Sequence, residues 1–311
     1  MRVTLNYQDL AIANESYPFP VKDNVVPCSD SAGVVAAVGD AVEDISVGDR
    51  VMTNFDLSNL CGPQKDWAHS LDGFLDGMLR QYIAVPAVAV AKIPEACELS
   101  FTQLASLVCT GITAWNTLFG CILLQLDQTV LFLDTGGVSI TALQLAKAAG
   151  AVTIITSSSD EKLHEGQLWC ESCVINYRKT PDWAAEINRI TDGRGADYIV
   201  ENGGAGTIAQ SIKACVCGGM IAVIGFLTSV KQEDMPNVAS MAPDKGCIVR
   251  GVVVGSKQLL GDVIRFVSNK NVQPYIHETF GFSCEGTREA FDHLKAARHT
   301  GKIGIEVASK K

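Results

Sequence analysis

From about residue 129 onward, short apolar segments alternate with longer amphipathic ones. The apolar segments are rich in β-branched residues, as in parallel strands that are covered by helices on both faces. They predict strands at 129–133, 152–156, 173–177, 197–201, 220–226 and 247–254. The segments between them predict helices at 138–149, 160–168, 182–191, 206–214 and 256–269. This alternation predicts an α/β fold with a doubly wound parallel sheet of the Rossmann type.

The first 95 residues follow a different pattern, in which short strand-like runs are separated by turns. The sequence VGDRV, for example, indicates a tight turn that leads into a strand. The segment HTGKIGIEVAS near the end of the chain is strand-like as well. We therefore assign residues 1–95, completed by about 270–311, to an irregular β domain, and residues 96–269 to the doubly wound domain.

The strand at 129–133 runs into a glycine turn that opens a helix, which is the context of a dinucleotide fingerprint. Gly136 allows the backbone to approach a pyrophosphate, whose charge the helix N-terminus favours. Asp134 stands where the first glycine of the fingerprint is usual, and its carboxylate would repel a phosphate unless it turned away. The residues predicted to bind the cofactor here are Thr135, Gly136, Gly137 and Val138.

The end of the next strand indicates which cofactor binds. An NAD site usually has an acidic residue there for the ribose 2′-hydroxyl. This chain instead has Ser157, Ser158 and Lys162, whose donors and positive charge suit a 2′-phosphate. Asp160 is a candidate for the N-cap of the following helix. We expect NADPH rather than NADH.

Charge and composition exclude several classes of protein. The formal net charge is −9 and no long run of basic residues occurs, so we expect no nucleic-acid partner. The most apolar stretch, residues 82–93, contains a proline and is too short to cross a bilayer. The first residues show no signal peptide. These features predict a soluble, cytoplasmic protein without a membrane partner.

The chain has eleven cysteines, and their scattered positions are typical of free thiols in a reducing compartment. Only Cys170 and Cys173 have the spacing of a metal or redox pair. Because no second pair stands at matching spacing, we interpret them as packing thiols.

Ten sequence blocks in register resemble the medium-chain dehydrogenase/reductase superfamily, and in particular its zinc-free branch similar to quinone oxidoreductases. Members of that branch are often labelled zinc-type alcohol dehydrogenase-like. The blocks cover nearly the whole chain and include LNYQDLAI, VPCSDSAGVVAAVG, TGITAWNTLFG, TGGVSITALQLAKAAGA, VINYRKTPDW, RGVVVGS and HTGKIGI.

The resemblance implies a GroES-like catalytic domain and a Rossmann domain, with the active site in the cleft between them. It implies that Tyr177 helps to hold the 2′-phosphate, that Gly225 and Phe226 line the nicotinamide side, and that Lys302 lies near the cofactor. It also implies a homodimer, formed through the edge strand with the sequence CIVRGVVVG.

The chain departs from the family pattern in several places. Relatives have about 30 more residues before the block LNYQD, so we expect an incomplete GroES-like domain with exposed apolar surface and an unpaired edge. The sequence LWCESC at 168–173 and the carboxylate of Asp134 are further departures.

The zinc ligands of the family are also replaced. Asn6 stands where zinc-dependent relatives have a cysteine, and Ser29 where they have the histidine. Cys109 matches the third ligand position, and Asp30 cannot complete a set of three. We therefore expect no metal at this site.

Without zinc, a reductase of this type needs another group to stabilise the substrate oxygen and to supply a proton. Tyr17 matches the proton-donating or substrate-binding tyrosine of related enoyl reductases, although it could simply cap a turn in its loop. Asn6 could hydrogen-bond a carbonyl or the nicotinamide amide. Glu201 could bind the cofactor or cap the next turn.

These observations favour an NADPH-dependent, zinc-independent oxidoreductase that acts on a small-molecule carbonyl, enone, enoyl group or quinone. Secondary metabolism is one setting in which such an enzyme could act. Two alternatives stay open. One is an alcohol dehydrogenase that oxidises a secondary alcohol. The other, suggested by Asp134, is a degenerate homologue with a structural or regulatory role.

Overall fold

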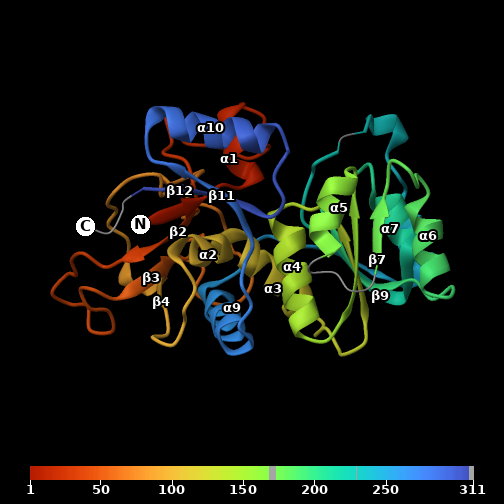
Figure 1. Cartoon of the computed structure of the whole chain (residues 1–311), viewed down its shortest axis with the longest axis horizontal. Coiled ribbons are helices and arrows are strands. Elements are labelled where there is room, and N and C mark those ends of the chain that lie inside the picture. The colour runs from red at the N-terminus through yellow and green to blue at the C-terminus, as the bar shows by residue number, and fades with distance from the viewer. Residues whose placement is uncertain (168–172, 229, 308–311) are drawn as a thin grey trace. The chain divides into compact units, whose positions relative to one another are not determined.

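The computed structural model describes residues 1–167, 173–228 and 230–307, and these form two compact units (Figure 1). The first unit contains residues 1–112 and 254–311, and the second contains residues 113–253. The predicted boundaries were 95/96 and about 269/270, so the contacts place 96–112 and 254–269 in the first unit instead. Cys170, one half of the only predicted cysteine pair, lies outside the described residues.

The first unit is built on a mixed sheet with the strand order β11-β12-β1-β2-β3-β4. The strands are β1 (Arg2–Thr4), β2 (Asp30–Val34), β3 (Arg50–Thr53), β4 (Val90–Lys92), β11 (Ile276–Gly281) and β12 (Lys302–Glu306). β1 pairs antiparallel with both β2 and β12. The first strand is therefore internal, and the edges of this sheet are β11 and β4. The unpaired edge that we expected does not lie at β1.

Helices of the first unit pack on this sheet, and α1 also contacts α10. The helical segments are η1 (Ala87–Ala89), α1 (Tyr7–Ala13), α2 (Phe101–Ser106), a π-helical turn (Leu107–Gly111), α9 (Lys257–Lys270) and α10 (Cys284–Lys295). α2 contacts β1 and β2, and the backbone of Lys257 at the start of α9 donates to Asn59 O. These contacts explain why segments predicted for the doubly wound domain pack in the first unit.

An open groove crosses the first unit beside β2 and β3, and apolar side chains line much of it. Val34 and Val38 on its wall are 52% and 41% exposed.

The second unit contains a parallel sheet with the order β10-β9-β8-β5-β6-β7. Its strands are β5 (Thr129–Leu133), β6 (Val152–Ser157), β7 (Cys173–Asn176), β8 (Ala196–Glu201), β9 (Cys215–Val223) and β10 (Ile248–Gly251). The chain order reverses between β5 and β8, and ligands of such sheets bind at the carboxyl ends of the strands at that point. The predicted α/β fold with a Rossmann sheet is confirmed.

The helical segments of the second unit, with α3 starting one residue before it, are α3 (Ile112–Phe119), α4 (Gly137–Ala148), α5 (Asp160–Gln167), α6 (Trp183–Ile190), α7 (Ile208–Ala214), η3 (Gln232–Asp234) and α8 (Val238–Lys245). α8 was not predicted. It has no buried residue and contains Pro243, so the chain shows no apolar period there. The cap of Asn237, whose side chain accepts from Ser240 N–H, starts this helix, and Gly246 in the left-handed region ends it.

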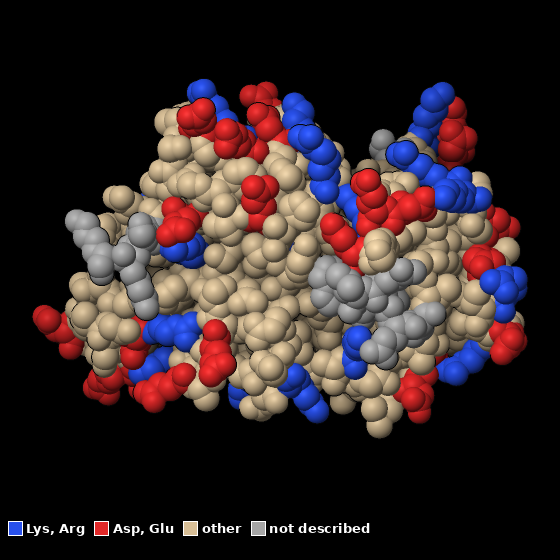
Figure 2. Space-filling model, in the orientation of Figure 1, with Lys and Arg blue, Asp and Glu red and all other residues tan. Residues whose placement is uncertain are grey.

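Two findings bear on the environment of the protein. No helix among the described residues is both long and apolar enough to cross a membrane. On the face drawn in Figure 2, basic and acidic side chains are interspersed, and no broad area of one sign covers either unit.

Candidate functional site

The turn between β5 and α4 has the geometry of an anion site. Gly136 is the N-cap of α4 and has an extended backbone (φ −76°, ψ −177°). Ser139 Oγ donates to Leu133 O at 2.8 Å, and Asn202 Nδ2 donates to Ser139 Oγ at 2.9 Å. These bonds hold the end of β5 against the first turn of α4, where free N–H groups and the helix dipole favour a negative charge. The predicted residues of this turn are all here: Thr135, Gly136, Gly137 and Val138.

Asp134 begins the turn with a positive φ of 82°, a conformation that glycine adopts more readily than other residues. Its Oδ1 accepts a hydrogen bond from Gly136 N–H at 2.6 Å. Burial raises the pKa of this carboxyl to about 6. Hydrogen bonds from Gly136, Asn202 and Ser139 and the charge of Lys162 act in the opposite direction.

Serines and a lysine gather at the carboxyl end of β6, as predicted. Ser157 is the last residue of β6 and is 3% exposed, and its backbone oxygen accepts from Tyr177 N–H at 3.0 Å. Ser159 Oγ accepts from Lys162 N–H at 3.4 Å, so Ser159 rather than Asp160 caps α5. The structure thus brings Ser157, Ser158, Lys162 and Tyr177 to one edge of the sheet.

Asp160 is neutralised by its neighbours rather than directed at a ligand. Its carboxylate accepts from Asn176 Nδ2 at 2.7 Å and forms an ion pair with Lys179. These contacts hold the pKa of Asp160 below its usual value, with the hydrogen bond from Lys179 as the largest cause. The carboxylate of Asp160 is therefore already bound by Asn176 and Lys179.

Glu201, at the end of β8, caps the turn that follows it. Its Oε1 accepts from Gly203 N–H at 2.8 Å and from Gly204 N–H at 2.9 Å. The hydroxyls of Thr207 and Ser211 donate to the same carboxylate. Because Glu201 is fully buried, these bonds favour turn capping over cofactor binding.

The predicted nicotinamide loop follows β9. A Cβ atom at Gly225 would lie 2.3 Å from Asn202 O, so this position requires glycine. The loop is joined to the end of β8, because Leu227 N–H donates to Asn202 O and Thr228 Oγ1 donates to Gly203 O. Phe226 is 46% exposed on this loop.

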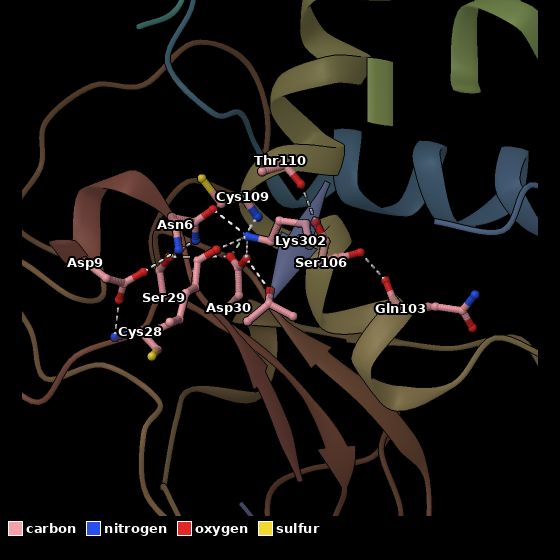
Figure 3. A network of polar contacts seen from close by, with 12 residues as sticks. Asn6, Asp9, Cys28, Ser29, Asp30, Gln103, Ser106, Cys109, Thr110 and Lys302 are labelled. Atoms are coloured by element: carbon pink, nitrogen blue, oxygen red, sulfur yellow. Dashed lines mark hydrogen bonds and ion pairs between the residues drawn. The ribbon is translucent and has the colours of Figure 1, made fainter. Parts of the chain in front are cut away.

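The first unit contains a second candidate centre, a buried polar cluster around Lys302 (Figure 3). Lys302, at the start of β12, is 3% exposed. Its Nζ donates to Leu5 O and Asn6 Oδ1, both at 2.7 Å, and to Asp30 Oδ2 at 2.9 Å. All three ammonium protons are used within this unit. The role of Lys302 beside the cofactor, which the resemblance implied, stays a prediction.

Asp30 is the acceptor at the centre of this cluster. Thr4 Oγ1 donates to its Oδ2 at 2.7 Å, and Cys109 N–H donates to its Oδ1 at 2.9 Å. Asn6 Nδ2 reaches Ser29 Oγ at 3.5 Å, and Ser29 Oγ reaches Asp30 Oδ1 at the same distance. Asn6 and Ser29 are thus hydrogen-bonded to each other, and Ser29 and the backbone of Cys109 both donate to Asp30.

The donors of this cluster do not fit a catalytic zinc ion, which needs three ligands from cysteine, histidine or carboxylate. Asn6 Oδ1 and the Asp30 carboxylate already bind the ammonium of Lys302, whose positive charge would repel a dication. In the metal-free chain, burial and the charge of Asp30 raise the pKa of the Cys109 thiol. Among the described residues, no group of three or more potential ligands is arranged to hold a metal.

An acid pair that the sequence did not reveal lies beside this cluster. Asp9 accepts from Asn6 N–H at 2.6 Å and from Cys28 N–H at 2.7 Å. Asp72, which is fully buried, faces Asp9, and burial together with the Asp9 charge raises its pKa to about 11. Asp72 is therefore protonated, which avoids a second negative charge beside Asp9. It was missed because nothing in the linear sequence places residue 72 beside residue 9.

Tyr17 lies in the loop after α1, where its ring packs edge-on against Phe19 with centroids 5.4 Å apart. Burial raises its pKa to about 12, and the nearby acids Cys109 and Asp72 raise it in the same direction. The phenol therefore keeps its proton at neutral pH. Of the two predicted catalytic residues, Asn6 lies in the Lys302 cluster and Tyr17 lies within electrostatic range of it.

Comparison with known proteins gives family matches in both units. Residues 1–95 match the alcohol dehydrogenase GroES-like domain, and residues 137–269 match the zinc-binding dehydrogenase family.

Individual proteins match over nearly the whole chain. The chain is 39% identical to the zinc-type alcohol dehydrogenase-like protein C1773.06c of Schizosaccharomyces pombe, over 98% of this chain and 88% of that protein. It is 28% identical to the quinone oxidoreductase-like protein 2 homolog of Nematostella vectensis, over 97% of this chain and 78% of that protein. The crystal structure of an NAD-dependent alcohol dehydrogenase superposes with a TM-score of 0.85 at 27% identity, covering 99% of this chain and 90% of that one. The predicted family is confirmed: the chain belongs to the medium-chain dehydrogenase/reductase superfamily of NAD(P)-binding oxidoreductases.

Proposed function

We propose that the protein is an NADPH-dependent, zinc-independent reductase of a small-molecule carbonyl, enone, enoyl group or quinone. In the carbonyl case, a hydride from NADPH and one proton convert a C=O group into CH–OH and leave NADP⁺. The observation that carries the proposal is the ammonium of Lys302, which binds Asp30 and also Asn6, the residue that stands at one of the zinc-ligand positions implied by the family resemblance.

The choice of NADPH is supported by the residues at the end of β6. Ser157, Ser158 and Lys162 lie there, and Asp160, the acid at the start of α5, is paired with Lys179. Hydroxyl donors and positive charge suit a 2′-phosphate, whereas a ribose 2′-hydroxyl is usually bound by a carboxylate.

Asn6 is the group that we assign to the substrate oxygen. Its Oδ1 accepts from the Lys302 ammonium, which polarises the amide and makes its N–H groups stronger donors. One of these N–H groups reaches Ser29 Oγ only at the long distance of 3.5 Å. A polarised amide donor of this kind stabilises charge that develops on a carbonyl oxygen.

Tyr17 is the group that we assign as proton donor. With a pKa of about 12, its phenol stays protonated at neutral pH and transfers its proton to an alkoxide, which is a much stronger base. Its loop position in the same unit as Asn6 supports this role.

The proposal is tested on the purified chain by metal analysis and by oxidation of NADPH and NADH with a panel of aldehydes, ketones, enones and quinones. We expect substoichiometric zinc, activity that survives a chelator, and a preference for NADPH. Tyr17→Phe should lower kcat by about 10²–10⁴-fold with little change in KM. Tyr82→Phe, at a side chain that is 78% exposed, is the matched control and should leave kcat unchanged.

Other results would favour the alternatives. One zinc per chain, with activity that a chelator removes, would contradict the proposal and favour an alcohol dehydrogenase. A preference for NADH would agree with the NAD-dependent alcohol dehydrogenase that shares the fold. No binding of either nucleotide would favour a degenerate homologue.

We also propose a homodimer in which the edge strand β10 of one chain pairs with that of another. Ile248 on this strand and Val253 just after it are 40% and 48% exposed, and they supply apolar surface for such an interface. The described cysteines are all free thiols, which supports a reducing compartment such as the cytoplasm.

A further inference from the structure

The carboxylate of Asp134 lies inside the turn that would receive the cofactor's pyrophosphate. Its Oδ1 is 2.6 Å from the backbone nitrogen of Gly136, the N-cap of α4. A Cβ atom built at Gly136 would lie only 3.1 Å from the same oxygen, so the carboxylate covers this face of the turn. The left-handed backbone of Asp134 directs the side chain back onto its own turn.

A pyrophosphate and this carboxylate compete for the same donors. Backbone N–H groups at a helix N-terminus are the donors that a dinucleotide phosphate uses in a fold of this type. The Gly136 N–H donates to Asp134 instead. Two negative groups cannot share this turn without strong repulsion, because water is partly excluded from it.

We propose that Asp134 occupies the phosphate-binding turn of the empty protein and that a dinucleotide binds with uptake of one proton by this carboxyl. This inference rests on the proposed function as an NADPH-dependent enzyme. It makes Asp134 the residue that sets how cofactor affinity depends on pH. A neutral carboxylic acid no longer repels the phosphate and can donate a hydrogen bond to it.

The charged groups around Asp134 determine the pH range over which this carboxyl affects cofactor affinity. Lys162 from α5 favours the charged carboxylate, and Glu165 on the same helix acts in turn on Lys162. From β8, Glu201 is held by Gly203 and Gly204, and Asn202 donates to the end of β5. From β6, Thr156 Oγ1 accepts from the backbone N–H of Asp134 at 3.4 Å.

The sign of the pH dependence follows from these groups. In the empty protein the pKa of Asp134 is about 6, and the negative pyrophosphate raises it further in the complex. Between these two pKa values, affinity falls about tenfold for each unit by which pH rises. Below the lower value, affinity is independent of this carboxyl.

The experiment is calorimetric titration of the full chain with NAD⁺ and NADP⁺ between about pH 5.5 and pH 8.5, in buffers of different ionisation enthalpy. Proton uptake is then read directly from the heats. NAD⁺ serves as the main probe, because it lacks the 2′-phosphate, which itself titrates near pH 6.

Two variants separate the charge from the hydrogen bond. Asp134→Asn keeps an acceptor for Gly136 N–H and tolerates the left-handed backbone, and Asp134→Gly removes the side chain altogether. Asp192→Asn is the matched control, since Asp192 also has a positive φ (52°) but is exposed in the turn after α6.

We expect the wild type and Asp192→Asn to take up close to one proton near pH 7.5 and to bind NAD⁺ at least tenfold more weakly at pH 8 than at pH 6. Both Asp134 variants should bind without proton uptake and with at least tenfold higher affinity at pH 8. Equal affinity and equal proton uptake in the wild type and both variants would overturn this inference while leaving the proposed function intact. No binding by any folded variant at any pH would overturn both.

Discussion

Lys302 carries a buried positive charge that links β12 to two other segments of the first unit. Its ammonium joins Leu5 after β1, Asn6 before α1 and Asp30 in β2. A buried ion pair contributes little net stability when both partners are compared with apolar residues, but removal of one partner leaves an uncompensated charge. Lys302 and Asp30 should therefore behave as a unit.

Lys302→Met should lower the free energy of unfolding by about 3–5 kcal/mol, because Asp30 and two further acceptors lose their donor. The double variant Lys302→Met with Asp30→Asn should be less destabilised than the sum of the single changes, because neither charge is then left alone. Urea denaturation of the four proteins measures this coupling. Additive losses would contradict the role that we assign to the pair.

Asp72 should make the protein less stable as pH rises. Its folded pKa of about 11 lies far above the value of about 3.9 for an unfolded aspartate. Between these values the folded state holds a proton that the unfolded state has released, so the free energy of unfolding falls with increasing pH. The loss is at most about 1.4 kcal/mol per pH unit for this one group.

Asp72→Asn should therefore stabilise the protein at about pH 8 more than at about pH 5, as shown by the midpoints of denaturant unfolding. Asparagine also tolerates the positive φ of 57° at this position. Asp76→Asn is the control: Lys22 holds the pKa of Asp76 below its usual value, so this change should bring no gain at high pH. A larger gain at pH 5 than at pH 8 for Asp72→Asn would refute a protonated Asp72.

At the scale of elements, periodicity predicted most of the second unit. All six strands of the described sheet were anticipated, because buried parallel strands are continuously apolar. The helix α8 escaped prediction because it contains Pro243 and only Val238 and Met241 of its side chains pack, partly buried, against the core. The glycine turn and the serines after β6 were found because local motifs carry them.

The polar cluster of the first unit could be predicted only in part. Asn6, Ser29, Asp30 and Cys109 were singled out by resemblance, but the ammonium that joins Asn6 to Asp30 comes from Lys302, which is 272 positions from Asp30 in the sequence. Asp9 and Asp72 could not be paired, since contacts between distant segments leave no period in the sequence. Asp134 was recognised as unusual, but its bond to Gly136 follows from a backbone conformation that composition does not reveal.

The edge strand β10 makes a prediction about assembly. An exposed edge with apolar side chains pairs readily with another strand, and lysine at the edge prevents this. We expect the wild type to have the mass of a dimer in light scattering, and Ile248→Lys with Val253→Lys to have the mass of a monomer. Leu126→Lys, at a loop side chain that is 73% exposed, should stay dimeric. A monomeric wild type would rule out the proposed interface.

At the scale of the whole molecule, the first unit is assembled from both ends of the chain, whereas the second is continuous. β1 pairs with β2 on one side and with β12 on the other, so this sheet is complete only after β12 has joined it. Contacts between positions so far apart slow folding, because a long loop must be ordered before they form. The second unit has no such requirement.

The hydrogen bond from Lys302 to Leu5 spans 297 positions of the sequence. During protein synthesis, Leu5 therefore has to wait for Lys302 to be added before this bond can form. At about 5–20 residues per second, a ribosome needs about 15 to 60 s between these two residues. During this interval the second unit emerges complete, while Arg2–Thr4 has no partner on the side that β12 later covers. The newborn chain thus presents an open strand, Arg2–Thr4, until residues 302–306 have been synthesised.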